Sequence, residues 1–148
     1  MRALAYGMLG SRAAMDDALQ DAYLKAWRAR ESFRADAAFG TWLHRIVMNT
    51  CIDHLRRRRP VVPLEVIDPA DERAGAEQRI GAVDELQAAL DLLPPDQRLA
   101  VLLVDGEGRT YEEVAELMGV AHGTIASRVH RGRHALRRTL TDETGEER

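Results

Sequence analysis

The stretch from residue 39 to residue 59, FGTWLHRIVMNTCIDHLRRRR, constrains the fold most, because a single helix has to carry three patterns at once. Apolar side chains recur along one side at helical steps of three and four, namely Phe39, Leu43, Ile46, Val47, Cys51 and Leu55. A second side has the same spacing and carries Arg45, Asn49, Asp53 and then Arg56 or Arg57. Four consecutive arginines end the stretch, and Pro60 stops the helix by disfavouring the α conformation just before it. The stretch predicts a long helix with an apolar side, a hydrogen-bonding side and a basic end.

The basic end of this helix has two interpretations on these residues alone. The arginines could bind nucleic-acid phosphates, or they could be solvated charges that the helix dipole favours in a last turn. Trp42, at the edge of the apolar side, could likewise be half-buried core or a stacking platform for a base. A second basic element near the other end of the chain favours the nucleic-acid interpretation.

Composition predicts a soluble globular protein with one or two small domains. The chain has 148 residues, of which 45% are hydrophobic and 30% charged. No apolar run approaches the roughly 20 residues of a membrane span, and no secretory leader is visible. The single cysteine excludes an intramolecular disulfide and fits a reducing cytoplasm.

The net charge of −3 is unevenly distributed along the chain. Residues 1–59 carry +5, residues 60–93 carry −6 and residues 94–148 carry −2. Within the last part, the segment from His122 to Leu140 contains five arginines and no acidic residue. The acidic overall balance therefore hides two basic surfaces separated by an acidic middle.

The first 59 residues predict a domain of three helices. Residues 1–9 are helical in pattern, and Ser11 can cap a second helix running to about Arg30. A short connection at 33–38 then leads into the long helix. The inward side of the second helix is expected to hold Leu19, Ala22, Tyr23, Ala26 and Trp27. A mainly polar side of the same helix holds Asp17, Gln20, Asp21 and Leu24, which on spacing alone could be a solvated face.

Residues 60–75 predict a linker, because they are rich in proline and acidic side chains and have little capacity to bury themselves. Helical pattern resumes near Ala76. The apolar seam of that helix is expected to be Val83, Leu86, Leu90 and Leu93. Pro95 can then begin the next helix, whose inward residues are expected to be Leu99, Leu102 and Leu103.

Residues 76–141 predict a second all-α domain that contains a helix-turn-helix. Thr110 and Glu113 have the spacing of a capping box, and Gly119 fits the end of that short helix. A turn then leads to a second helix from about His122 to Leu140, with 142–148 as an acidic tail. The outward side of this helix, which would enter a major groove, carries His122, Thr124, Ser127, Arg128 and Arg131. An ordinary helical hairpin is the alternative, and Ala121 and Gly132 count against a strong second helix.

The sequence offers no catalytic constellation and no metal site. His44 and Cys51 are separated by roughly 10 Å along a straight helix, too far to share one ion. Cys51 with His54 would supply only two of the roughly four ligands that zinc takes. No glycine-rich phosphate loop and no nucleophile with an evident base occur. We therefore expect neither enzymatic activity nor a cofactor.

Taken in order, the segments of the chain resemble the extracytoplasmic-function group of bacterial sigma factors, which keep only regions 2 and 4. The resemblance covers nearly the whole chain. The segments that carry it are ALAYGMLGS (3–11), DALQDAYLKAWR (17–28), FRADAAFGTWLHRIVMNTCIDHLRRRR (33–59), LPPDQRLAVLLVDGEGRTYEEVAELMGV (93–120) and GTIASRVHRGRHAL (123–136). Their order and spacing are highly specific, although the last segment alone resembles many helix-turn-helix regulators.

The resemblance implies a promoter-specificity subunit, with core RNA polymerase and promoter DNA as partners and a cytoplasmic location. It assigns polymerase docking to Asp17, Gln20, Asp21 and Leu24, against the solvated-face interpretation. It assigns recognition and melting of the minus-ten element to Trp42, Arg45, Asn49, Asp53, Arg56 and Arg57. It assigns the minus-thirty-five element to Arg128 and Arg131, supported by His122, Thr124 and Ser127. The acidic linker would thread polymerase near the RNA exit path.

The chain departs from the family pattern in three places. It begins one or two helical turns later than usual, which predicts a truncated start or a thinner first domain. Ala126 stands where lysine is usual, and Gly132 replaces a common alanine. A stand-alone helix-turn-helix regulator and a polymerase-docking protein without initiation activity remain as alternatives. The resemblance also allows for an anti-sigma protein as a further partner.

Overall fold

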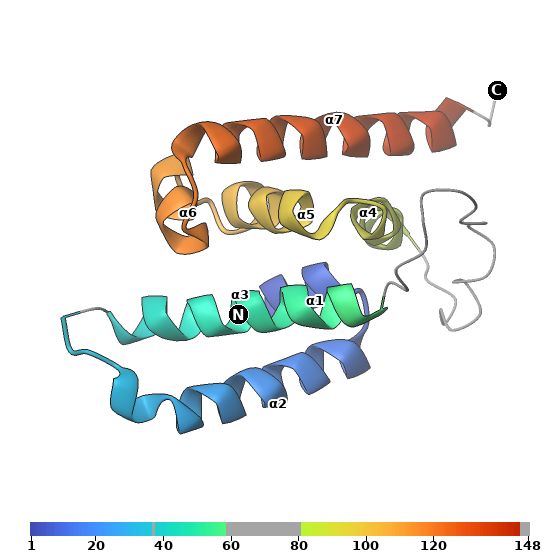
Figure 1. The fold of residues 1–148 in the computed structure, drawn as a ribbon. Coiled ribbons are helices and arrows are strands. Elements are labelled where there is room, and N and C mark those ends of the chain that lie inside the picture. The colour runs from blue at the N-terminus through green and yellow to red at the C-terminus, as the bar shows by residue number, and fades with distance from the viewer. Residues whose placement is uncertain (37, 59–80, 146–148) are drawn as a thin grey trace.

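The computed structural model describes residues 1–36, 38–58 and 81–145, and these residues form helices and short connections without a strand. The predicted linker at 60–75, Arg59 and the expected helix start at Ala76 lie outside the described residues. Figure 1 shows α7 lying over α5 and α4 on one side of the molecule and α2 on the opposite side, with α1 and α3 between. The described fold is thus all-α, and its two halves lie against each other.

The N-terminal half contains three α-helices, as the sequence predicts. Ser11 caps the second of them by accepting a hydrogen bond from the Ala14 amide at 3.2 Å. That helix ends at Arg28, slightly before the expected Arg30, and a 3₁₀ turn follows it. The elements are α1 (Arg2–Leu9), α2 (Arg12–Arg28), η1 (Arg30–Ser32) and α3 (Phe39–Arg58).

The C-terminal half contains four α-helices and one π-helical turn. The first helix of the predicted helix-turn-helix ends at Gly119, which adopts a left-handed conformation with φ of 67°. The last helix continues to Gly145, past the predicted end at Leu140 and into the expected tail. The elements are α4 (Ala82–Asp91), α5 (Pro95–Val101), η3 (Leu102–Gly106), α6 (Tyr111–Met118) and α7 (His122–Gly145).

Local end signals were predicted correctly, but several inward faces were not. Thr110 and Glu113 form the expected capping box, and Pro95 starts α5. Val83 and Leu86, predicted on the seam of α4, are exposed, because this helix is buried along Gln87, Ala89 and Leu90 instead. Tyr23, Trp27 and Phe39 were also predicted inward, and each is about half exposed or more.

A row of alanines explains why the aromatic residues of α2 are exposed and not buried as predicted. The buried side of this helix is Ala14, Met15, Ala18, Leu19, Ala22 and Ala26. Four of these are alanines spaced four apart, which lets α2 approach α1 and α3 closely and turns the aromatic side chains outward. On α3 the buried side is likewise rotated from the predicted one, and comprises His44, Val47, Met48, Thr50, Cys51 and Leu55.

One apolar cluster runs through both halves of the molecule. It joins buried side chains of α1, α2 and α3 to those of α5, η3, α6 and α7. Gly7 of α1 lies where a Cβ atom would come within 2.9 Å of the Leu102 side chain in η3. The two halves therefore share a core instead of hanging independently from their connection.

His44 lies at the contact between the halves. Its side chain is buried, and its Nε2 lies 3.4 Å from the Glu107 carboxylate, which also accepts a hydrogen bond from Arg109 Nε at 2.8 Å. Burial lowers the pKa of His44; the Glu107 charge opposes this effect, while Arg109 and the N-terminal amine reinforce it. The neutral imidazole is therefore the form that this packing favours.

We expect Gly132→Ala to destabilise the chain, although alanine is the better helix former. The new Cβ would lie 2.6 Å from Val101 Cγ2 of α5, so the two helices must move apart. Overpacking typically costs about 1–3 kcal/mol, which exceeds the gain of up to about 1 kcal/mol in helix propensity. Urea denaturation should show the loss, and adding Val101→Ala should recover part of it. Gly123→Ala, in open space on the same helix, is the control and should be neutral or slightly stabilising.

We also expect His44 to make folding stability fall as the solution is acidified. Its pKa is lower in the folded chain than the reference 6.5, so its contribution is complete above about pH 6.5 and is lost below it, where the unfolded chain binds the proton. Urea denaturation at about pH 7.5 and about pH 5.5 should show a smaller pH dependence for His44→Gln than for the natural chain. His130→Gln, at an exposed position of α7, is the control. An unchanged pH dependence in His44→Gln would contradict the assignment.

Candidate nucleic-acid interface

The polar side of α2 is an open surface. Asp17 and Gln20 are exposed and Leu24 is 48% exposed, at the spacing that places them on one face. Asp21 is half-buried, because its carboxylate lies 2.7 Å from His54 Nε2 of α3. The structure thus brings the four predicted docking residues to one face, with Asp21 held toward α3.

The exposed aromatics of α2 extend this face beyond the predicted residues. Tyr23 borders a shallow hollow that Gln20 and Leu24 also line. Trp27 is 65% exposed, and the Arg30 guanidinium lies 4.4 Å from the centre of its ring. Sequence reasoning missed both aromatics as surface residues; the alanines at every fourth position of α2 are the signal that could have placed them outside.

The hydrogen-bonding side of α3 faces the C-terminal half across a recess. Asn49, Asp53 and Arg56 line this recess from α3, together with the apolar Met48 and Ile52. From the other side it is lined by Asp96, Leu99, Met118, Val120 and Arg128. The α3 face is therefore accessible but borders the C-terminal half directly.

Two residues of the α3 face have partners within the chain. Arg45 is exposed, and its Nη2 donates to the Glu116 carbonyl oxygen of α6 at 3.2 Å. Asp53 is half-buried, with its carboxylate 3.7 Å from Lys25 Nζ of α2. Asn49, Arg56 and Arg57 are exposed. The two arginines at the basic end of α3 that are predicted to contact DNA are thus exposed to solvent.

Trp42 belongs to a surface cluster of three aromatic rings. Its ring centroid lies 5.2 Å from that of Phe33 and 5.7 Å from that of Phe39. Trp42 and Phe33 are half-buried, whereas Phe39 is 58% exposed. The cluster sits at the beginning of α3 and presents aromatic faces close to the row of hydrogen-bonding side chains.

On α7 the predicted groove-facing residues have different environments. Arg131 and His122 are exposed, while Thr124 and Ser127 are half-buried. The His122 imidazole lies 3.4 Å from the Glu112 carboxylate and 5.6 Å from the Tyr111 ring centre. These positions leave the first turns of α7 accessible on one side.

Arg128 differs from the other residues of this face. Its Nη2 lies 3.7 Å from the Asp96 carboxylate of α5, and its side chain is only 24% exposed. It lines the same recess as Asn49 of α3. The structure therefore brings the two predicted DNA-binding helices to opposite walls of one recess, with Arg128 and Asn49 on its two sides.

The described part of the chain has neither a cluster of metal-ligating side chains nor a membrane-spanning helix. No group of three or more histidine, cysteine or acidic side chains could hold a metal ion there. Cys51 is buried, and burial raises the pKa of its thiol to about 11. Among the same residues, no helix combines the length and hydropathy needed to cross a bilayer.

Two sigma-70 families match the chain in sequence. Sigma-70 region 2 matches residues 1–61, and Sigma-70 region 4 matches residues 84–136. ECF RNA polymerase sigma factor SigM of Mycobacterium tuberculosis is 48% identical over 127 residues, covering 84% of this chain and 63% of that protein. ECF RNA polymerase sigma-E factor of Escherichia coli is 37% identical over 134 residues, covering 81% of this chain and 70% of that protein. The chain thus spans less than two thirds of the length of SigM.

Solved structures of known proteins have a similar fold. The sigma factor RpoE of Bartonella quintana, in complex with the anti-sigma factor NepR, aligns with a TM-score of 0.69 at 28% identity, covering 95% of this chain and 89% of that one. CnrH, in complex with the cytosolic domain of CnrY, aligns with a TM-score of 0.67 at 24% identity and shows the same fold. Regions 2 and 4 in order, the helical fold and the identity to curated relatives together show that the chain belongs to the ECF family of RNA polymerase sigma factors.

Proposed function

We propose that this chain binds core RNA polymerase and directs it to specific promoters, and that it is not itself an enzyme. The observation that carries the proposal is the presence of three separate surfaces on three helices. The α2 face offers carboxylate, amide and apolar groups to a protein, whereas α3 and α7 offer arginines, aromatic rings and hydrogen-bonding side chains to DNA. A docking face combined with two DNA faces is what a promoter-specificity subunit requires.

The α2 face is the proposed polymerase-docking surface. Asp17, Gln20 and Leu24 can be contacted without disturbing the core, since the apolar side of α2 points the other way. Asp21 contacts His54 instead, and we propose that it fixes α2 against α3. It would also form the rim of the docking face. The apolar Tyr23 and Leu24 would supply buried area at the centre of such an interface.

The α3 face is proposed to engage the unpaired strand of the minus-ten element. Extruding a base from a duplex costs a few kcal/mol of stacking, which contacts to the flipped base and aromatic stacking can offset. Trp42, within its aromatic cluster, and Asn49 supply the two kinds of contact. Arg45 and Asp53 border the same face, and Arg56 and Arg57 would hold the neighbouring duplex through phosphates.

The first turns of α7 are proposed to read the minus-thirty-five element in the major groove. Arg131 and His122 are accessible there, and Thr124 and Ser127 lie beside them. Arg128 would have to leave Asp96 before contacting DNA. The two side chains are 24% and 42% exposed and lie 3.7 Å apart, and such a partly exposed ion pair contributes little stability to the free chain.

The domain division and partners follow from the same proposal. Residues 1–59 would act as region 2, residues 60–75 as the acidic linker and residues 76–141 as region 4. A third proposed partner is an anti-sigma protein, because the similar sigma factor RpoE was solved in complex with an anti-sigma factor. Working on polymerase and DNA places the chain in the cytoplasm.

The decisive experiment is reconstitution. Core RNA polymerase with the purified chain should produce run-off transcripts from promoters selected out of genomic DNA, and neither component should do so alone. A stand-alone regulator would instead bind duplex DNA tightly without polymerase. A docking protein without initiation activity would co-purify with polymerase and yield no transcript at any promoter, which would exclude the proposal.

We expect the double substitution Asp17→Ala with Gln20→Ala to abolish co-purification with core polymerase while leaving the fold intact. Both side chains are exposed and lie outside the buried side of α2, so folding does not require them. Pull-down on core polymerase measures the loss, and circular dichroism measures the fold. Glu85→Ala, which removes an exposed carboxylate from α4, is the matched control. Unfolding of the double variant would show that the α2 face is misassigned.

We expect Arg131→Ala to weaken binding of the holoenzyme to the upstream promoter duplex. A lost base contact should cost about 1–3 kcal/mol and relax sequence preference, whereas a lost phosphate contact should lower affinity uniformly and reduce the salt slope by about one. Footprinting over a salt series on natural and altered upstream elements distinguishes the two. Arg137→Ala, an exposed residue further along α7, is the control. An unchanged footprint would mean that α7 docks differently.

A further inference from the structure

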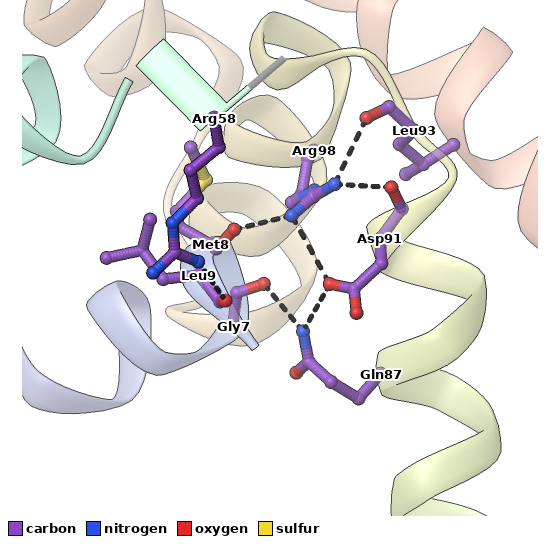
Figure 2. Close-up of polar contacts among 8 residues, drawn as sticks. All are labelled: Gly7, Met8, Leu9, Arg58, Gln87, Asp91, Leu93 and Arg98. Atoms are coloured by element: carbon purple, nitrogen blue, oxygen red, sulfur yellow. Dashed lines mark hydrogen bonds and ion pairs between the residues drawn. The ribbon is translucent and has the colours of Figure 1, made fainter. Parts of the chain in front are cut away.

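The carbonyl end of α1 receives side-chain donors from the other half of the chain. The last carbonyl groups of a helix lack partners within it and must be satisfied elsewhere. Figure 2 shows that Gln87 Nε2 donates to the Gly7 oxygen at 3.1 Å and that Arg98 Nη1 donates to the Met8 oxygen. Arg58 of α3 donates to the next oxygen, that of Leu9, at 3.4 Å.

The donors Gln87 and Arg98 are buried and are held in position by the corner between α4 and α5. Gln87 is 5% exposed and Arg98 is 3% exposed. Asp91 Oδ1 accepts from Gln87 Nε2 at 3.0 Å, and the Asp91 backbone oxygen accepts from Arg98 Nη2 at 2.7 Å. We call Gln87, Asp91 and Arg98 the corner triad. Its geometry is preorganised, so that both donors point at α1 together.

The end of α1 is shaped for this close approach. A Cβ atom at Gly7 would lie 2.9 Å from Leu102, and one at Gly10 would lie 3.1 Å from the Asp91 carboxylate. Gly10 also has a φ of 76°, a conformation that suits glycine at a helix end. A glycine inside a helix is normally unfavourable, so Gly7 is explained by the contact and not by α1 alone.

The arrangement held by the corner triad cannot be the one that binds a promoter at two points. By the positions in their names, the minus-ten and minus-thirty-five elements lie about 25 base pairs apart, which is roughly 85 Å at about 3.4 Å per step. Here Asn49 of α3 and Arg128 of α7 line one recess, and Arg45 is bonded to α6. Two helices that line one recess cannot contact, at the same time, two elements that are separated by roughly 85 Å.

We propose that the corner triad is a latch that holds the two halves in a closed form, and that this latch must open before the chain can engage a promoter. The need for opening before promoter binding rests on the proposed function, whereas the latch itself rests on the contacts at α1. Because its donors are buried, the latch gives the closed form more specificity than the surface ion pairs around it. Opening transfers Gln87, Arg98 and the α1 carbonyls to water, where each finds a replacement partner.

The test separates latch opening from folding. Arg98 also donates to the Asp91 and Leu93 carbonyls within its own half, so its removal would damage that half. Gln87 is the cleaner target: Gln87→Glu keeps its shape but turns a carboxylate toward the Gly7 oxygen and Asp91. Gln87→Met removes the donor without adding charge. Gln97→Glu, at a half-buried position of α5, is the charge-matched control.

Spin labels at Ala13→Cys of α2 and Arg137→Cys of α7, both exposed, report the separation of the halves by pulsed electron resonance. Cys51 is buried and should stay unlabelled. The natural chain and Gln97→Glu should give one short distance. Gln87→Met should raise the open fraction about fivefold, as the loss of one buried hydrogen bond implies, and Gln87→Glu should raise it more. Circular dichroism should show unchanged helix content.

Unchanged distances in both Gln87 variants would overturn the latch whether or not the chain supports transcription. Longer distances in both variants, with helix content kept, would establish the latch even if the run-off assay fails. With core polymerase at limiting chain concentration, Gln87→Met should also give more transcript than the natural chain. Equal or lower yield from an open variant would refute the requirement for opening.

Discussion

The orientation of α3 determines most of what this structure can do. The helix is buried along His44, Val47, Met48, Cys51 and Leu55, and this choice of side sends its hydrogen-bonding row toward the recess shared with α5, α6 and α7. A rotation by one residue would bury part of that row and expose the core. Because α3 contacts α1 and α2 on one side and α5 and α6 on the other, it also forms part of the boundary between the two halves.

Helix ends were predicted better than helix faces, for a physical reason. End signals are local: the hydroxyl of Ser11, the capping box at Thr110 and the glycine at 119 act on amides and carbonyls a few residues away. Which face of a helix is buried depends instead on the helices that pack against it. A row of alanines lets a neighbouring helix pack closely, so α2 buries its alanines and leaves Tyr23 and Trp27 exposed. An expectation that the largest apolar side chains are the buried ones therefore fails on this helix.

Two glycines show what a single sequence cannot reveal. Gly132 was interpreted as a weakness in α7, yet it lies where Val101 of α5 leaves no room for a side chain. Gly7 has the same role against Leu102. In each case the cost of glycine in the helix is local, and the compensating contact comes from a residue far away in the chain. The candidate DNA residues were found from spacing and resemblance, but their intramolecular partners required coordinates.

Those partners have a common character that bears on how the chain could be activated. Arg128 faces Asp96, His122 faces Glu112 and Asp53 faces Lys25, all at 3.4–3.7 Å and all partly exposed. Such pairs contribute little and are screened by salt, so DNA or a protein partner can displace them at small cost. The buried donors of Gln87 and Arg98 are different, because moving them without replacement partners is expensive. Under the proposed function, competition for the exposed charges would therefore tune binding, whereas access to both proposed DNA faces at once would depend on whether the carbonyl end of α1 keeps its donors.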